Sequence, residues 1–335
     1  MNRRTRRTLL IVAAVLLFLA VAIFLRSKAP PEAARLLPES DGMLYLNLKP
    51  IRTFTHFKDL KPPDRAPDYQ RFVDATGFDW ERDLDQVAIA LHRMPDPKGP
   101  NGPVAYSMIL VGKLTGRRLN DWLDAQATSR ESYAGHTIYN ITSQDRTVRV
   151  TQIGYDMIAV SNTPTAEQIH SIIDRHRTAA LPFAGSSLLA RHYHDVPLLS
   201  LAWGLGQIGL PFSESGAISI FGLSLPIEAD STIIASLRWT GSLHLRIEEI
   251  APTEEKAASQ AAALATLVTM ARGFTVPLGD TPANNGLKEL LKTAAVTQKQ
   301  DRVVVTALLP ASFLTSLDQQ VTPPEKQNPP PPTAP

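Results

Sequence analysis

Short apolar runs bounded by turn residues recur along the chain and predict β-strands. They come mostly in pairs separated by polar loops, which is the pattern of β-hairpins. The predicted strands cover residues 43–48, 86–91, 104–111, 137–141, 147–153, 157–160, 196–202, 232–239, 242–250 and 302–309, and Val296 belongs to the partner of the last strand.

Segments with apolar residues at helical spacing lie between the hairpins. Leu119 and Leu123 share one helix face, and Ile169, Ile172 and Ile173 share another. The longest helix of the main domain is predicted to begin after Thr253 and to end at Gly273, with Glu254 and Glu255 in its first turn. Shorter helices are predicted at residues 51–57, 69–76, 287–292 and 311–317.

The two halves of the chain have a similar order of elements, which is a strand followed twice by a hairpin and a helix. A local echo accompanies this order, because residues 141–151 and 296–306 both carry Gln-Asp-Arg at a predicted turn. Two hairpins that independently use polar turns would look the same. We predict that the chain contains a duplicated α+β domain, with repeats at residues 36–180 and 181–320. Its antiparallel sheet is expected to be covered by helices on one side.

An uncharged apolar run at residues 8–25 predicts a transmembrane helix. Arg3, Arg4, Arg6 and Arg7 precede it, whereas only two basic residues follow it closely. This asymmetry predicts that residues 1–7 are cytoplasmic and that the bulk of the chain is extracytoplasmic. Residues 26–35 then form a spacer.

Two features of the same region resemble export signals. Ser27-Lys28-Ala29 has the form of a cleavage site, and the arginine pair before the run resembles a twin-arginine signal. Pro30 directly follows the Ser27-Lys28-Ala29 segment, and the apolar run is strongly hydrophobic, which suits a retained anchor better than a cleaved signal. We therefore expect a retained anchor. The absence of cysteine excludes a lipoprotein anchor.

Composition fits a folded domain, with 44% hydrophobic and 20% charged residues. The formal net charge is +2, and it becomes about −4 once the six basic residues around the apolar run are set aside, so a nucleic-acid surface is not indicated. A large lumenal domain of a eukaryote would more often carry disulfides, which favours a bacterial envelope, at the inner (cell) membrane. The proline-rich residues 321–335 predict a disordered tail.

The motif Gly204-Leu205-Gly206-Gln207-Ile208-Gly209 matches the dinucleotide-binding pattern. Pro211 follows at once, where that fold needs a helix. We therefore interpret the motif as a glycine-rich connection and expect no cofactor.

Two further motifs could bind metal. His192, His194 and Asp195 lie close together, but no third protein ligand can be assigned to the two imidazoles, and a polar boundary between helix and strand explains them. Asp83-Leu84-Asp85 has the D-x-D form found in many glycosyltransferases, although it leads into a predicted hairpin. We assign no catalytic, cofactor-binding or metal-binding residue.

Residues 37–48, LPESDGMLYLNL, followed by hairpin–helix repeats, resemble uncharacterised bacterial proteins anchored by one N-terminal span. The resemblance covers roughly residues 35–320 and implies no activity. The leading hypothesis is a single-pass, non-enzymatic binding or scaffold protein of the cell envelope, whose partners are the membrane and an envelope protein. The alternative is an anchored envelope enzyme, either a glycosyltransferase or a metal-dependent hydrolase.

Overall fold

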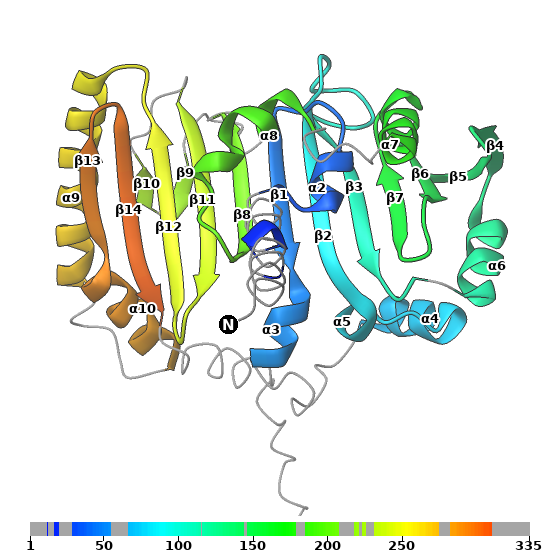
Figure 1. Ribbon diagram of the computed structural model, residues 1–335, viewed down its shortest axis with the longest axis horizontal. Helices are drawn as coiled ribbons and strands as arrows, with labels where there is room; N and C mark the ends of the chain where they lie inside the picture. Colours follow the sequence, from blue (N-terminus) through cyan, green and yellow to red (C-terminus); the bar gives the residue numbers. More distant parts are fainter. Residues whose placement is uncertain are drawn as a thin grey trace, which may run out of the picture.

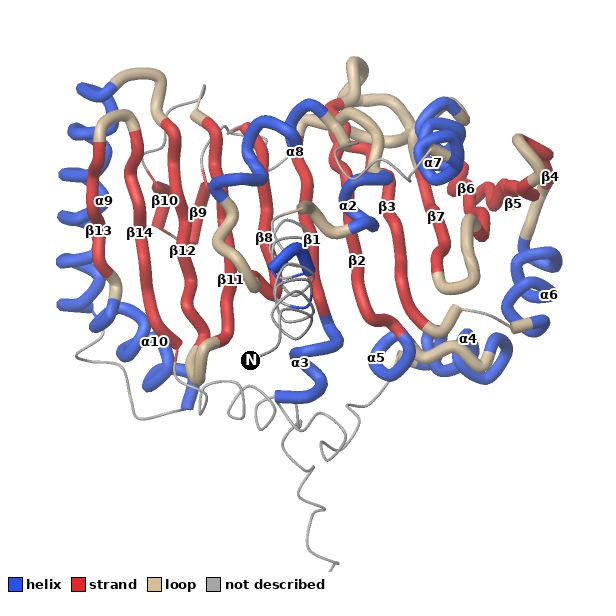
Figure 2. The backbone as a smooth tube through the Cα atoms, viewed as in Figure 1, coloured by secondary structure: helices blue, strands red, loops and turns tan. Residues whose placement is uncertain are grey.

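The computed structural model describes residues 29–54, 66–114, 116–143, 146–178, 185–207, 218–220, 223–225, 231–274 and 282–309, together with residue 12 and residues 17–19. Twelve of the described strands form one antiparallel sheet, and two form a separate hairpin (Figures 1 and 2). The order in the large sheet is β13-β14-β12-β11-β8-β1-β2-β3-β7-β6-β5-β4.

The strands of the first half are β1 (Gly42–Asn47), β2 (Leu84–Arg93), β3 (Val104–Gly112), β4 (Ser129–Tyr133), β5 (His136–Ser143), β6 (Arg146–Gln152) and β7 (Met157–Ser161). Those of the second half are β8 (Ser200–Gln207), β9 (Ile218–Ile220), β10 (Leu223–Leu225), β11 (Thr232–Trp239), β12 (Leu243–Ile250), β13 (Ala295–Lys299) and β14 (Arg302–Leu309).

The helices include α2 (Glu32–Leu36), α3 (Leu48–Phe54), α4 (Pro67–Thr76), α5 (Trp80–Asp83), α6 (Arg117–Gln126), α7 (Glu167–Arg177), α8 (Ser187–His192), the 3-10 turn η1 (Tyr193–Asp195), α9 (Glu254–Phe274) and α10 (Pro282–Thr293). Their ends follow ordinary capping rules. Gly77 closes α4 with a φ of +73°, and the Ser186 side chain accepts a hydrogen bond from the Leu189 amide at the start of α8.

The main core lies between the sheet and three helices. Met43 and Tyr45 of β1 and Trp203 and Leu205 of β8 pack with α2, α7 and α8 on one sheet face. These helices lie in front of the sheet in Figure 1. The α+β class with a large antiparallel sheet is therefore confirmed.

The expectation that helices cover only one side is wrong. A second core on the opposite face contains Ile158 and Val160 of β7 together with Leu119 and Leu123 of α6. A third core places Leu264 of α9 against β14. The outer strands carry apolar side chains on both faces of the sheet, so helices must pack on both faces to bury them.

The two halves of the sheet mirror each other about the central pair β1–β8. Outwards from this pair, the order is β1-β2-β3-β7-β6 in the first half and β8-β11-β12-β14-β13 in the second. In each half the first three strands of the main sheet are therefore neighbours in chain order, and the last strand lies inside the strand that precedes it in the chain. The echoed segments 141–151 and 296–306 do not occupy equivalent places, because β14 lies beside the third strand of its half whereas β6 is one strand further out. The duplication itself stays a prediction.

The predicted span at residues 8–25 lies outside the described residues except at Val12 and residues 17–19, which are helical. The part of the chain that the structure describes contains no helix that is both long and apolar enough to cross a membrane. The predicted helix at residues 311–317 and the proline-rich tail also lie outside the described residues.

Candidate functional site

A shallow apolar groove of about 390 Å³ lies across the five central strands of the sheet. Its volume falls within the range of small-molecule and peptide sites. The groove is lined by Leu44, Tyr45, Leu46, Val87, Ile89, Ala202, Trp203, Gly204, Ala235, Ser236, Leu237 and Leu245.

Strand register shows which face the groove occupies. Leu44 pairs with Gly204, Gly204 with Ala235, Ala235 with Ile247, and Ile247 with Val305. Directly paired residues project to the same face of a sheet. Val305 packs against the α9 core, so the groove lies on the α9 face and opposite to the main core.

The groove lies in the middle of that face, which none of the described helices covers. The α4–α6 core covers one part of the face and the α9 core covers the other, while Leu44 between them is 38% exposed. The side chains of its neighbours Met43 and Tyr45 project to the main core and are buried, so Tyr45 borders the groove only with its main chain. The central strands are therefore apolar on both faces, which is the composition of a sheet that has a layer on each side.

Gly204 shapes the groove floor. A Cβ atom at this position would come within 2.9 Å of Leu44 Cδ2, so glycine gives the Leu44 side chain room to lie across β8. Gly204 and Gly206 are paired on both sides within β8. The dinucleotide-like motif thus begins as a central antiparallel strand rather than as a phosphate-binding loop. Its last two residues lie outside the described residues.

The predicted histidine cluster falls on α8 and η1, and its carboxylate is held by an arginine. Arg302 Nη1 lies 2.8 Å from Asp195 Oδ1, and His194 Nε2 lies 3.4 Å from the same oxygen. Burial lowers the pKa of His192. Among the described residues no group of three or more His, Asp and Glu is placed to hold a metal ion.

Arg302 also joins a buried charge cluster that the sequence did not reveal. Its Nη1 lies 2.7 Å from Glu248 Oε1, and Arg246 Nη2 lies 2.5 Å from Glu248 Oε2. The Glu248 side chain is only 2% exposed. Two arginines therefore face the buried Glu248 carboxylate, and Arg302 also pairs with Asp195, so the cluster compensates the charges of two carboxylates with two arginines.

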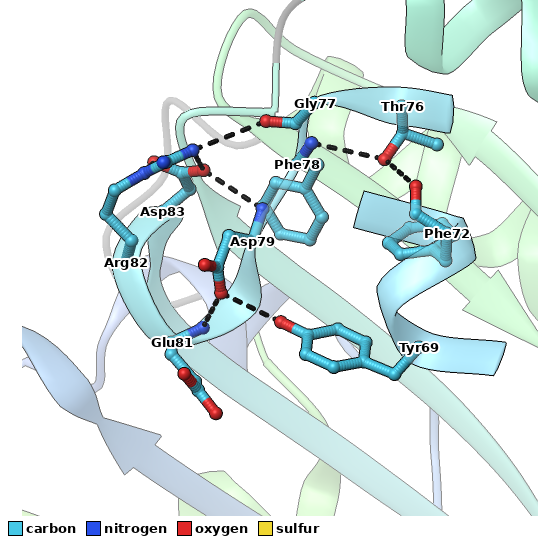
Figure 3. Close-up of polar contacts among 9 residues, drawn as sticks. All are labelled: Tyr69, Phe72, Thr76, Gly77, Phe78, Asp79, Glu81, Arg82 and Asp83. Atoms are coloured by element: carbon cyan, nitrogen blue, oxygen red, sulfur yellow. Dashed lines mark hydrogen bonds and ion pairs between the residues drawn. The ribbon is translucent and has the colours of Figure 1, made fainter. Parts of the chain in front are cut away.

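Asp83, the first carboxylate of the D-x-D motif, makes contacts within the protein (Figure 3). Asp83 Oδ2 accepts a hydrogen bond from the Asp79 amide at 3.0 Å and lies 2.6 Å from Arg82 Nη2. The hydrogen bonds from Arg82 lower the pKa of Asp83. Asp85 forms an ion pair with Arg52. The two carboxylates thus stabilise the entry into β2 and the contact with α3, and they do not converge on one site.

A buried row of hydrogen-bonded side chains, one imidazole and two hydroxyl groups, lies on the sheet face of the main core. His92 Nε2 and Ser107 Oγ are 2.9 Å apart, and Ser107 Oγ lies 3.3 Å from Ser161 Oγ. A serine bonded to histidine is the arrangement of an activated nucleophile. Ser107 and Ser161 are both 0% exposed, however, so the hydroxyl that would attack is sealed from substrate. The row satisfies buried polar groups in the core.

No family model matches the chain, and no curated protein matches it. Solved structures titled as crystal forms III and I of TP0453 share 9% and 10% sequence identity with it, each at a TM-score of 0.42. They cover 87% and 88% of this chain and 99% of the TP0453 chain. A likeness this slight supports no inference about function.

Burial of His92 makes stability depend on pH. Burial lowers the pKa of His92, so the unfolded chain binds the proton more readily than the folded chain does. The free energy of unfolding should therefore fall as the pH drops below about 6.5, by up to about 1.4 kcal/mol per pH unit for this group. His92→Gln should flatten that slope in urea titrations, with His176→Gln as the control for losing an imidazole. An unchanged slope would contradict the assignment.

Loss of Arg302 should leave the buried carboxylates poorly compensated. Arg302→Met is expected to lower the free energy of unfolding by about 3 kcal/mol, and adding Glu248→Gln should restore part of it. Arg71 pairs with Asp68 at 78% and 87% side-chain exposure, so Arg71→Met is the matched control. It should cost less than about 1 kcal/mol. Equal losses in both arginine variants, measured by urea unfolding, would refute a stabilising role for the cluster.

Proposed function

We propose that the chain is a single-pass, membrane-anchored extracytoplasmic protein of the bacterial cell envelope that binds a partner through the apolar groove and carries out no chemistry. The observation that carries the binding role is the middle of the α9 face, which no described element covers. Apolar side chains from five neighbouring strands meet there, most of them half-buried and Leu44 38% exposed, and such patches on folded domains mark interaction sites.

Membrane anchoring rests on the sequence of residues 1–28. The apolar run is long enough for a bilayer span, and arginines before it orient the N-terminus to the cytoplasm. In the described part of the run, Val12 and Phe18 are 50% and 76% exposed. An exposed apolar surface of this kind suits a lipid environment.

Topology can be tested with a reporter that is active only outside the cytoplasm. A fusion after residue 60 should be active, because the positive residues before the span retain the N-terminus inside. A fusion placed directly before Thr8 is the control and should be silent. An inactive reporter after residue 60, at normal protein levels, would exclude the proposed orientation.

Groove binding can be tested by photocrosslinking in cells. A benzoylphenylalanine at Leu44 should give one discrete adduct with a partner, whereas the same group at Lys98, in the polar loop between β2 and β3, should give none. Ala202→Asp on the groove floor should abolish the adduct by burying a charge at the contact. Ala262→Asp, on the exposed side of α9, is the matched substitution and should leave it intact.

Adducts of equal yield from Leu44 and Lys98 would contradict a specific groove site, as would an adduct that survives Ala202→Asp in a protein of unchanged unfolding midpoint. The enzymatic alternative is measured separately. Stoichiometric metal in the purified full chain, lost on His192→Ala or Asp85→Ala, would favour an envelope hydrolase or glycosyltransferase over a binding protein.

A further inference from the structure

The two ends of the large sheet differ in what they expose. One end, drawn lowest in Figure 1, is where β1, β3, β11 and β14 finish and where β2, β7, β8 and β12 begin. In the described residues from 29 to 309, the large apolar side chains that are most exposed, apart from Leu44 in the groove, lie at this end. They are Trp80 at 52%, Tyr155 at 90%, Leu198 at 44%, Leu199 at 83%, Met270 at 53% and Leu308 at 38%.

The topology explains why these residues share one end. Trp80 starts the short helix that leads into β2, and Tyr155 lies in the turn from β6 to β7. Leu198 and Leu199 form the turn just before β8. From β14 to β7 the residues cover eight adjacent strands, or roughly 34 Å at about 4.8 Å per strand. The loops of the opposite end are polar, as in the sequence MPDPKGPNG between β2 and β3.

The Leu198–Leu199 turn holds its apolar side chain in solvent at a conformational cost. Leu199 has a φ of +62°, a left-handed conformation that is unfavourable for a residue other than glycine. The Ser200 hydroxyl donates to the Pro197 carbonyl at 2.6 Å and fixes the turn. A strained turn that presents an 83% exposed leucine gains nothing within the fold, so the strain points to an external contact.

The residue types at this end match the membrane–water interface. Trp80 stacks on Tyr69 with ring centroids 4.6 Å apart, and Tyr155 projects from its turn. Tryptophan and tyrosine are enriched where one end of a side chain is apolar and the other is wet. Exposed lysines lie at the same end of the sheet, with Lys49 on α3, Lys113 after β3 and Lys292 on α10, the last 74% exposed and paired with Glu289 at 3.5 Å. Lysines close to an anionic bilayer are attracted to its head groups.

We propose that this end of the sheet rests on an anionic phospholipid surface, with Leu198, Leu199, Tyr155 and Trp80 inserted at the level of the head groups. The inference rests on the proposed membrane anchoring and names the surface that faces the bilayer. A membrane fits because the apolar residues form a long row rather than a pocket, and because the lysines complement anionic head groups. The groove on the α9 face remains separate from this contact.

The chain contains no cysteine, so single cysteines report unambiguously. The full chain is reconstituted in vesicles of phosphatidylcholine with phosphatidylglycerol, and an environment-sensitive fluorophore is attached at Leu199→Cys, Tyr155→Cys or Lys98→Cys. Labels at the first two positions should be quenched by nitroxide lipids and protected several-fold from aqueous iodide. The label at Lys98→Cys, at the opposite end, should behave in the reverse way.

The lysines provide a second measurement. In the combined variant Lys49→Glu, Lys113→Glu and Lys292→Glu, the label at Leu199→Cys should lose most of its protection from iodide. Vesicles of phosphatidylcholine alone should give the same loss with the unsubstituted lysines. Protection that is independent of both the lysines and the lipid charge would overturn the proposal of an anionic surface.

Two outcomes separate this inference from the anchoring on which it rests. If the chain resists alkaline extraction and the Leu199→Cys label is as open to iodide as the Lys98→Cys label, the anchor stands and the surface contact is refuted. If the chain is extracted but the purified protein binds anionic vesicles with the Leu199→Cys label protected, the anchor fails and the contact stands.

Discussion

The antiparallel pairing of β1 with β8 holds the described structure together. These two strands are the fifth and sixth in the order of twelve and are the only described pair that joins the two halves of the main sheet. Tyr45 stacks on Trp203 across the pair, with ring centroids 5.4 Å apart and an interplanar angle of 23°. Such cross-strand aromatic pairs stabilise a sheet beyond the ladder of backbone hydrogen bonds. The main core, the groove and the register of both halves depend on this pair.

Side chains above the sheet support the same junction. Glu39 accepts hydrogen bonds from the Ser187 amide and hydroxyl and pairs with Arg175 at 3.3 Å. Partial burial acts to raise the pKa of Glu39, but the bonds from Ser187 and the charge of Arg175 outweigh it and lower the pKa. One carboxylate thus links the segment before β1 with the end of α7 in the first half and the start of α8 in the second.

Local patterns in the sequence were sufficient for most of the elements. The three isoleucines of α7 are all buried as their spacing predicted, and the hairpin β11–β12 turns between the two strands predicted at residues 232–239 and 242–250. β4 was missed because its sequence SRESY is polar and lies at a sheet edge, where little apolar surface needs burial. β8 begins at Ser200 rather than at Val196, because the strained turn at Leu199 precedes it. The groove and the Arg302 cluster depend on register between distant strands, which no local pattern contains.

The pairing of Leu44 with Gly204 spans 160 positions of the chain, and this has a consequence for folding. Strand β1 emerges early, but its second neighbour exists only after β8 has been made. Until then the first half carries an open edge with apolar side chains on both of its faces, which is a template for aggregation. Non-local pairing of this kind is also slow to form. A protein of this topology therefore gains most from a chaperone during the interval between synthesis of its two halves.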